Sequence, residues 1–167
     1  MRINDGNLLI PILNNSNQLK SLQFINPYGN KWFLKNGEIK GNYFHIGELT
    51  TAPVIMICEG YSTGATLYAV TQLPQVIAFN ASNLVATAKN IKGRLPNATI
   101  IIAADNDSKT PNNIGLTKGK EAAREVGGEI ILPKFLPNDS GTDFNDFVNR
   151  YGAAKLLTML QARGGVS

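Results

Sequence analysis

The chain has 167 residues, enough for one domain or one domain with a small appendage, and its net charge of +4 with a pI of about 9.2 favours a polyanionic partner. A single cysteine, Cys58, excludes a disulfide framework and a Cys-rich zinc module. The absence of a signal peptide and of an apolar run long enough to span a bilayer predicts a cytoplasmic protein without a membrane partner.

Residues 1–50 predict a small antiparallel β-meander that packs on the rest of the chain. Short strand-like runs at 8–13, 19–25, 31–34 and 43–46 are separated by turn signals rich in Asn, Gly and Pro. The aromatic residues of this segment allow two interpretations. They form a stacking surface for single-stranded nucleic acid beside Lys31, Lys35 and Lys40, or they pack the meander on the main domain because so small a sheet is not stable alone.

Residues 51–167 predict one α/β domain with C-terminal helices. Strands are expected at 54–58, 76–80, 98–104 and 129–132. The first expected helix ends near residue 72, and further helices are expected at 83–95, 116–126, 144–151 and 153–162. Ser62 or Thr63 is the expected cap of the first helix. Alternation of this kind predicts a parallel, Rossmann-like sheet flanked by helices and joined by right-handed crossovers.

Carboxylates follow the predicted strands at the points where they end. Glu59 follows the first strand, and Asp105 and Asp107 follow the strand at 98–104. Because the carboxyl ends of parallel strands meet at one edge, these side chains should converge there and repel one another unless a cation lies between them. Oxygen ligands of this kind favour Mg²⁺ or Mn²⁺. Asp143 and Asp146 form a third acidic group, although Asp105 or Asp143 could instead only cap the following helix.

The order of these motifs resembles a known family. The chain resembles the TOPRIM domain shared by bacterial-type DNA primases, topoisomerases and some nucleases. The resemblance lies in three motifs in order: strand-Glu59-Gly60, strand-Asp105-x-Asp107 and then Asp143-Phe144-Asn145-Asp146. The segments CEGYSTGATL, ADND and DFND most resemble those of primases from phages, plasmids and integrative elements. Two positions depart from the bacterial-type pattern, because Thr63 and Asn145 stand where those primases often have Asp, and both changes concern a second metal site.

The resemblance implies metal-dependent nucleotidyl transfer, the synthesis of short primers on a single-stranded DNA template from nucleoside triphosphates. Under it, Glu59 is the catalytic base or helps to hold a metal, and Gly60 leaves room for substrate to approach the backbone. The implied metal ligands are Asp105, Asp107, Asp143 and Asp146. Further primase domains or a replicative helicase are the implied protein partners.

Six cations lie between residues 82 and 120 and suggest a phosphate-facing patch. They are Lys89, Lys92, Arg94, Lys109, Lys118 and Lys120. Solvated helix faces are the alternative interpretation. For the chain as a whole, a TOPRIM-type nuclease, an aspartyl-nucleophile phosphohydrolase and a non-catalytic nucleic-acid-binding module also stay open.

Overall fold

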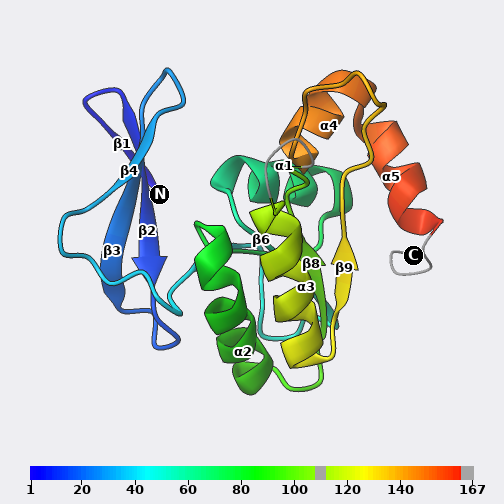
Figure 1. The fold of residues 1–167 in the computed structure, drawn as a ribbon. Coiled ribbons are helices and arrows are strands. Elements are labelled where there is room, and N and C mark those ends of the chain that lie inside the picture. The colour runs from blue at the N-terminus through cyan, green and yellow to red at the C-terminus, as the bar shows by residue number, and fades with distance from the viewer. Residues whose placement is uncertain (108–111, 163–167) are drawn as a thin grey trace.

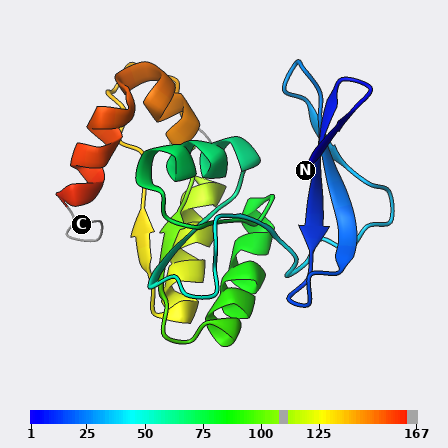
Figure 2. The same ribbon diagram turned by 180° about the vertical axis from the view of Figure 1, so that it is seen from behind.

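Two β-sheets lie side by side in the computed structural model, which describes residues 1–107 and 112–162 (Figures 1 and 2). The first sheet is antiparallel, with strand order β1-β2-β3-β4. Its strands are β1 (Arg2–Asn4), β2 (Asn7–Leu13), β3 (Leu19–Ile25) and β4 (Lys31–Phe33). The antiparallel meander predicted from the sequence is therefore confirmed, with one additional strand, β1.

A two-residue turn joins β1 to β2 and explains the additional strand. Asn4 pairs with Asn7, and the two residues between them, Asp5 and Gly6, have φ values of 47° and 75°. Positive φ at both central positions is the requirement of a type I′ hairpin turn, which Asp-Gly satisfies well. Asp5-Gly6 was thus the sequence signal for β1.

The second sheet is mostly parallel and has the order β5-β7-β6-β8-β9. Its strands are β5 (Phe44–Ile46), β6 (Val54–Cys58), β7 (Gln75–Ile77), β8 (Thr99–Ala103) and β9 (Glu129–Ile131). Strands β6, β7, β8 and β9 run parallel, whereas β5 is antiparallel to β7. The run at 43–46, predicted as part of the meander, belongs to this sheet instead. The prediction was wrong because the backbone of Phe44–Ile46 pairs with Gln75–Ile77, a partner about 30 residues further along the chain, and Phe44 packs near Tyr61 of α1.

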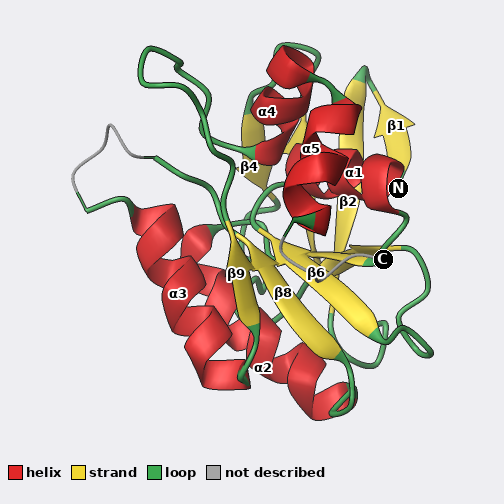
Figure 3. Ribbon diagram, turned by 90° about the vertical axis from the view of Figure 1, so that its right-hand side faces the viewer, coloured by secondary structure: helices red, strands yellow, loops and turns green. Residues whose placement is uncertain are grey.

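Helices cover both faces of the second sheet (Figure 3). They are α1 (Tyr61–Thr71), the short 3₁₀ helix η1 (Ala81–Asn83), α2 (Leu84–Arg94), α3 (Ile114–Val126), α4 (Phe144–Tyr151) and α5 (Ala153–Gln161). Alternate residues of β6 serve the two faces: Ile55 and Ile57 pack with α2 and α3, and Met56 and Cys58 pack with α1, α4 and α5. Among the described helices, none has the length and apolar character needed to cross a membrane.

The meander contributes to the same core. Ile10 and Ile12 of β2 are fully buried and belong to the apolar cluster that contains Met56 and Leu67. Between the sheets, Leu13 and Tyr43 form an isolated antiparallel bridge. The meander is therefore packed on the α/β part through side chains and backbone, not merely tethered to it.

Helix α1 begins immediately after Glu59. Its N-cap is Gly60, in an extended conformation and without a side-chain cap, so the predicted caps Ser62 and Thr63 lie inside the first turn. That prediction was wrong because Gly60 already has the extended backbone of an N-cap, with φ −97° and ψ 149°, and the helix begins at the next residue. Thr63 is buried, and its hydroxyl donates to Asp143 Oδ2 at 3.1 Å.

Candidate active site at the carboxyl edge of the parallel sheet

Glu59 and Asp105 lie at the same edge of the second sheet, as the sequence predicted. Strands β6 and β8 pair in parallel with Cys58 opposite Ala103, and each carboxylate follows its strand within two residues. Both meet the N-terminal turn of α3. A Cβ on Gly115 would lie 3.0 Å from Glu59 Oε1 and 2.8 Å from the Asp105 carbonyl oxygen. The two strand ends and the start of α3 therefore enclose one small acidic site.

The carboxylates of this site are held in an unfavourable electrostatic environment. Burial, with a further contribution from the charge of Asp107, raises the pKa of Glu59 to about 7. Burial also raises the pKa of Asp105 to about 8, and the neighbouring charges of Glu59, Asp143 and Asp107 act in the same direction. Glu59 and Asp105 thus lie within electrostatic reach of further carboxylates, Asp107 for both and Asp143 for Asp105.

Two buried oxygens of the site, Glu59 Oε1 and Asp105 Oδ1, have no hydrogen-bond partner among the described residues. Buried polar atoms of a folded protein are nearly always paired, so unpaired carboxylate oxygens that also repel one another suit a cation. Hard divalent ions prefer carboxylate oxygens, and the donor set therefore fits such an ion. Within residues 1–107 and 112–162, no group of three or more His, Cys, Asp or Glu side chains is arranged to hold a metal ion as the structure stands.

Asp143 and Asp146 cap helix α4. Asp143 is the N-cap and accepts from the Asp146 backbone N–H at 2.8 Å, while Asp146 accepts in return from the Thr142 N–H at 3.0 Å. Asp143 also acts electrostatically on Asp105, whereas Asp146 is exposed. The capping interpretation thus holds for Asp143, whereas the N-cap of α3 is Asn113 and not Asp105. The role of Asp143 and Asp146 as metal ligands stays a prediction, with Asp143 the better placed of the two.

The two positions that depart from the family pattern, Thr63 and Asn145, each take part in a hydrogen bond between α1 and the start of α4. Thr63 donates to Asp143, and the Thr66 hydroxyl donates to Asn145 Oδ1 at 2.9 Å. A neutral hydroxyl therefore stabilises Asp143 at a position where a further carboxylate would repel it. The two neutral residues lower the negative charge on the α4 side of the site.

Lys31 reaches the site from the meander, and sequence reasoning had assigned it only to a stacking surface. A Cβ on Gly60 would lie 3.9 Å from Lys31 Nζ. The charge of Lys31 opposes the upward shift in the pKa of Asp105. Nothing local to β4 marks this lysine, because its proximity to Gly60 arises only from the packing of one sheet beside the other.

Five of the six cations of the predicted phosphate patch lie in the part of the chain that the structure describes, and these five do not gather around the acids. Lys89 pairs with Glu125 at 2.6 Å, and Lys118 pairs with Glu121 at 2.7 Å. Lys92 donates to the Ala98 carbonyl and Arg94 to the Tyr43 hydroxyl, both near the opposite edge, where β8 begins. Lys120 is exposed on α3, and Lys109 lies outside the described residues. Their contact with phosphate stays a prediction.

Replacing Gly115 with alanine should distort this site. The added methyl would stand 2.8 Å from the backbone oxygen of Asp105 and 3.0 Å from Glu59 Oε1, closer than carbon normally approaches oxygen. We expect a loss of about 1–3 kcal/mol in unfolding free energy, as for other overpacked positions, and weaker Mn²⁺ binding. Gly93→Ala is the matched control because it lies in α2 with no atom within 4 Å, and it should be neutral or slightly stabilising. Equal melting temperatures and Mn²⁺ affinities for the two variants would contradict the packing described.

The parallel sheet, the glycine turn after Glu59 and the acidic edge define a Toprim-type α/β domain. A family model described as "Toprim domain" matches residues 54–154, and the chain belongs to this family. The resemblance drawn from the motifs is therefore confirmed. Two Escherichia coli proteins named "DNA primase TraC" are each 33% identical over 138 residues, which is 78% of this chain. The chain spans only 13% and 10% of their lengths.

Solved structures share the fold. The primase fragment of the bacteriophage T7 primase-helicase protein matches with a TM-score of 0.66 and 17% identity, over 91% of this chain and 62% of that one. The Aquifex aeolicus primase, comprising zinc-binding and RNA polymerase domains, matches with a TM-score of 0.59 and 16% identity, over 94% of this chain and 40% of that one. Because these matches extend beyond residues 54–154, they include the meander as well as the Toprim sheet.

Proposed function

We propose that this chain is the catalytic Toprim part of a DNA primase, which joins nucleotides from nucleoside triphosphates into short primers on single-stranded DNA. The observation that carries the proposal is that Glu59 and Asp105, at the carboxyl edge of a Toprim sheet, each hold one buried carboxylate oxygen without a hydrogen-bond partner among the described residues. The similarity to proteins named DNA primase over most of the chain supports this activity.

Each acidic residue has a distinct role under this proposal. Asp105 and Asp107, with Asp143 and Asp146 on the α4 side, would hold Mg²⁺ or Mn²⁺. When bound, the ion neutralises charge on the reacting phosphate and on the pyrophosphate leaving group. Glu59, whose pKa is raised to about 7, suits the removal of a proton from an attacking hydroxyl near neutral pH.

Two other parts of the chain would serve the substrate. Gly60 leaves the backbone open beside Glu59, so that a phosphate can approach it closely. Lys31 would bind that phosphate, since its ammonium group lies beside Gly60. Lys120, exposed on α3, would extend the contact with nucleic acid, and Lys89, Lys92, Arg94, Lys109 and Lys118 remain candidates for it.

Lys31→Gln should weaken nucleotide binding more than it slows the reaction at saturation. Loss of one charged contact to phosphate corresponds to an increase of about tenfold or more in KM for the nucleotide, with a smaller change in kcat. Lys35→Gln is the control, because it removes a charge from the same segment just beyond β4. A KM that rises equally in both variants would mean that only the overall charge of the meander matters.

A primer-synthesis assay tests the proposed function. The chain is incubated with single-stranded DNA, labelled nucleoside triphosphates and Mg²⁺ or Mn²⁺, with EDTA as the control. Oligomers that require the divalent ion support a primase, and a shortened template indicates the nuclease alternative. Mn²⁺ binding without either product indicates a binding module.

The proposal extends to organisation and setting. Residues 1–50 and 51–167 would act as two subdomains, with the meander supplying Lys31 and the α/β part supplying the acids. Further primase domains or a replicative helicase would be the protein partners, and the setting would be the cytoplasm of a cell that carries a phage or mobile element.

A further inference from the structure

The buried side chain of Asn83, the last residue of η1, makes hydrogen bonds to the segment that connects the two sheets. Only 3% of Asn83 is exposed. Its Oδ1 accepts from the Gly41 backbone N–H at 2.6 Å, and its Nδ2 lies 3.1 Å from the Ile39 carbonyl and 3.0 Å from the Asn42 carbonyl. The amide therefore binds both ends and the middle of the turn at 39–42, through which the chain leaves the meander.

Asn83 also binds the α/β part. Its Nδ2 lies 2.9 Å from the carbonyl of Ala78, directly after β7. The next residue, Phe79, has a φ of 73°, a left-handed conformation that is strained for a bulky side chain. Phe79 makes an edge-to-face contact with Phe33 of β4, with ring centroids 6.2 Å apart. Through the ring of Phe79, the strained turn after β7 thus contacts β4, the strand that carries Lys31.

A second amide strengthens the same attachment. Asn90 of α2 donates to the Gly41 carbonyl at 2.8 Å, so both polar groups of Gly41 are bound by side chains of the α/β part. Strand-like bonds between Leu13 and Tyr43, at 2.8 and 2.9 Å, continue the contact into β2. These bonds add a polar attachment near the base of the meander to the apolar packing of Ile10 and Ile12.

We propose that Asn83 is a positioning residue, which fixes the meander so that Lys31 stays beside Gly60 and the acidic site. Its role rests on the proposed function, because Lys31 acts there on the phosphate of the substrate. Asn83 does not itself reach the acids. It acts by fixing where the turn at 39–42 sits relative to the end of β7.

The variant Asn83→Asp tests this directly. It preserves shape and the acceptor for Gly41 but replaces the Nδ2 donor with an oxygen that repels the three carbonyls. Asn80→Asp is the matched control, since it makes the same chemical change three residues earlier. There the side-chain oxygen only accepts, from Ser82 Oγ at 2.6 Å and the Asn83 N–H at 2.9 Å, and the carboxylate can still accept both bonds.

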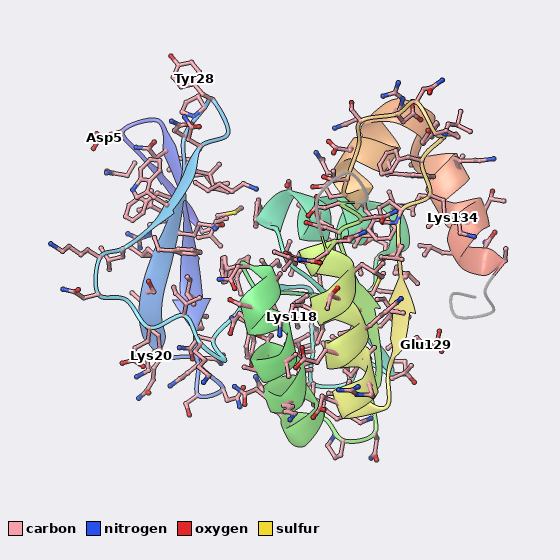
Figure 4. The ribbon with its side chains drawn as sticks, viewed as in Figure 1. Asp5, Lys20, Tyr28, Lys118, Glu129 and Lys134 are labelled. Carbon is pink, nitrogen blue, oxygen red and sulfur yellow. The ribbon has the colours of Figure 1, made fainter. Side chains whose placement is uncertain are left out.

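Orientation is measured as the distance between spin labels on cysteines that replace Tyr28 and Glu129. Tyr28 is 89% exposed in the meander, and Glu129 begins β9 on the other side of the molecule (Figure 4). The native Cys58 is fully buried and does not compete for the label. We expect a narrow distance distribution in the wild type and in Asn80→Asp, and a broad one in Asn83→Asp.

A kinetic measurement accompanies the distances. Misplacement of Lys31 should raise KM for the nucleotide about tenfold to a hundredfold in Asn83→Asp, while Asn80→Asp stays near the wild type. If Asn83→Asp does not fold, Asn90→Ala is used, which removes one bond to Gly41 and should broaden the distances less. A distribution as narrow as the wild type in the Asn83 or Asn90 variant overturns the proposal. If the distances broaden in Asn83→Asp but the wild type makes no primers, Asn83 still fixes the orientation of the meander. That result would reject the proposed function and not the role of Asn83.

Discussion

We expect Asp107→Asn to reduce Mg²⁺-dependent primer synthesis by about a hundredfold or more, because a lost carboxylate ligand removes charge stabilisation worth several kcal/mol. The metal-free fold should be at least as stable as that of the wild type, since Asp107 adds to the repulsion around Glu59. Melting curves without metal and Mn²⁺ titrations, combined with the rate of primer synthesis, measure both effects. If Asp107→Asn loses several kcal/mol of stability in metal-free buffer, the residue is structural and the metal assignment is wrong.

Glu59→Gln separates chemistry from metal binding. Glutamine preserves the shape of the side chain but cannot accept a proton, so the loss should fall on turnover more than on Mn²⁺ affinity. Asp107→Asn should instead lower the Mn²⁺ affinity more than Glu59→Gln does. Should Glu59→Gln abolish Mn²⁺ binding as completely as Asp107→Asn does, Glu59 is better described as a ligand than as a base.

Without metal, the stability of the protein should fall as the pH rises from about 4 to about 8. An unfolded chain releases the Asp105 proton near its ordinary pKa of 3.8, whereas the folded chain retains it up to about 8. Between these values the folded state binds more protons, so the free energy of unfolding decreases with pH. The upper limit of the change from Asp105 is about 6 kcal/mol, at about 1.4 kcal/mol for each pKa unit. Glu59 contributes in the same direction up to about pH 7.

Asp105→Asn should flatten this profile. Its melting temperature should exceed that of the wild type at pH 8 and approach it at pH 4, where the carboxyl is protonated in the folded state and still about half protonated in the unfolded state. Glu129→Gln, at an exposed position of β9, should leave the profile unchanged. Addition of Mg²⁺ at pH 8 should restore the wild type more than the variant. A wild-type stability that rises between pH 4 and pH 8 would show that the carboxylates are not destabilised in the fold.

Much of the Toprim sheet could be predicted because its local signals agree. The run Val54–Cys58 is apolar throughout, as a strand buried on both faces must be, and a glycine follows the carboxylate that ends it. The same reasoning located Thr99–Ala103 and the pair of acids after it. Once two such strands are parallel, their ends must share an edge, so the position of Glu59 relative to Asp105 required no knowledge of side-chain packing.

The remaining parts of the site depend on contacts between segments far apart in the sequence. Lys31 has no local pattern that distinguishes it from Lys35, and only the packing of β4 beside α1 brings it to Gly60. Likewise, no local pattern around Asn83 indicates that its amide binds the turn at 39–42. The Lys89 pair with Glu125 likewise depends on α2 lying against α3. Sequence periodicity carries no information on such pairs.

All four outer edges of the two sheets are very short. Strands β1, β4, β5 and β9 have three residues each, and β9 begins with the exposed carboxylate of Glu129. A sheet edge recruits another strand through its row of unpaired backbone groups, and short or charged edges prevent this. Each edge here offers too few such groups to template a further strand. The antiparallel β5 in particular stops the parallel sheet from continuing past β7, which protects the chain against edge-to-edge aggregation.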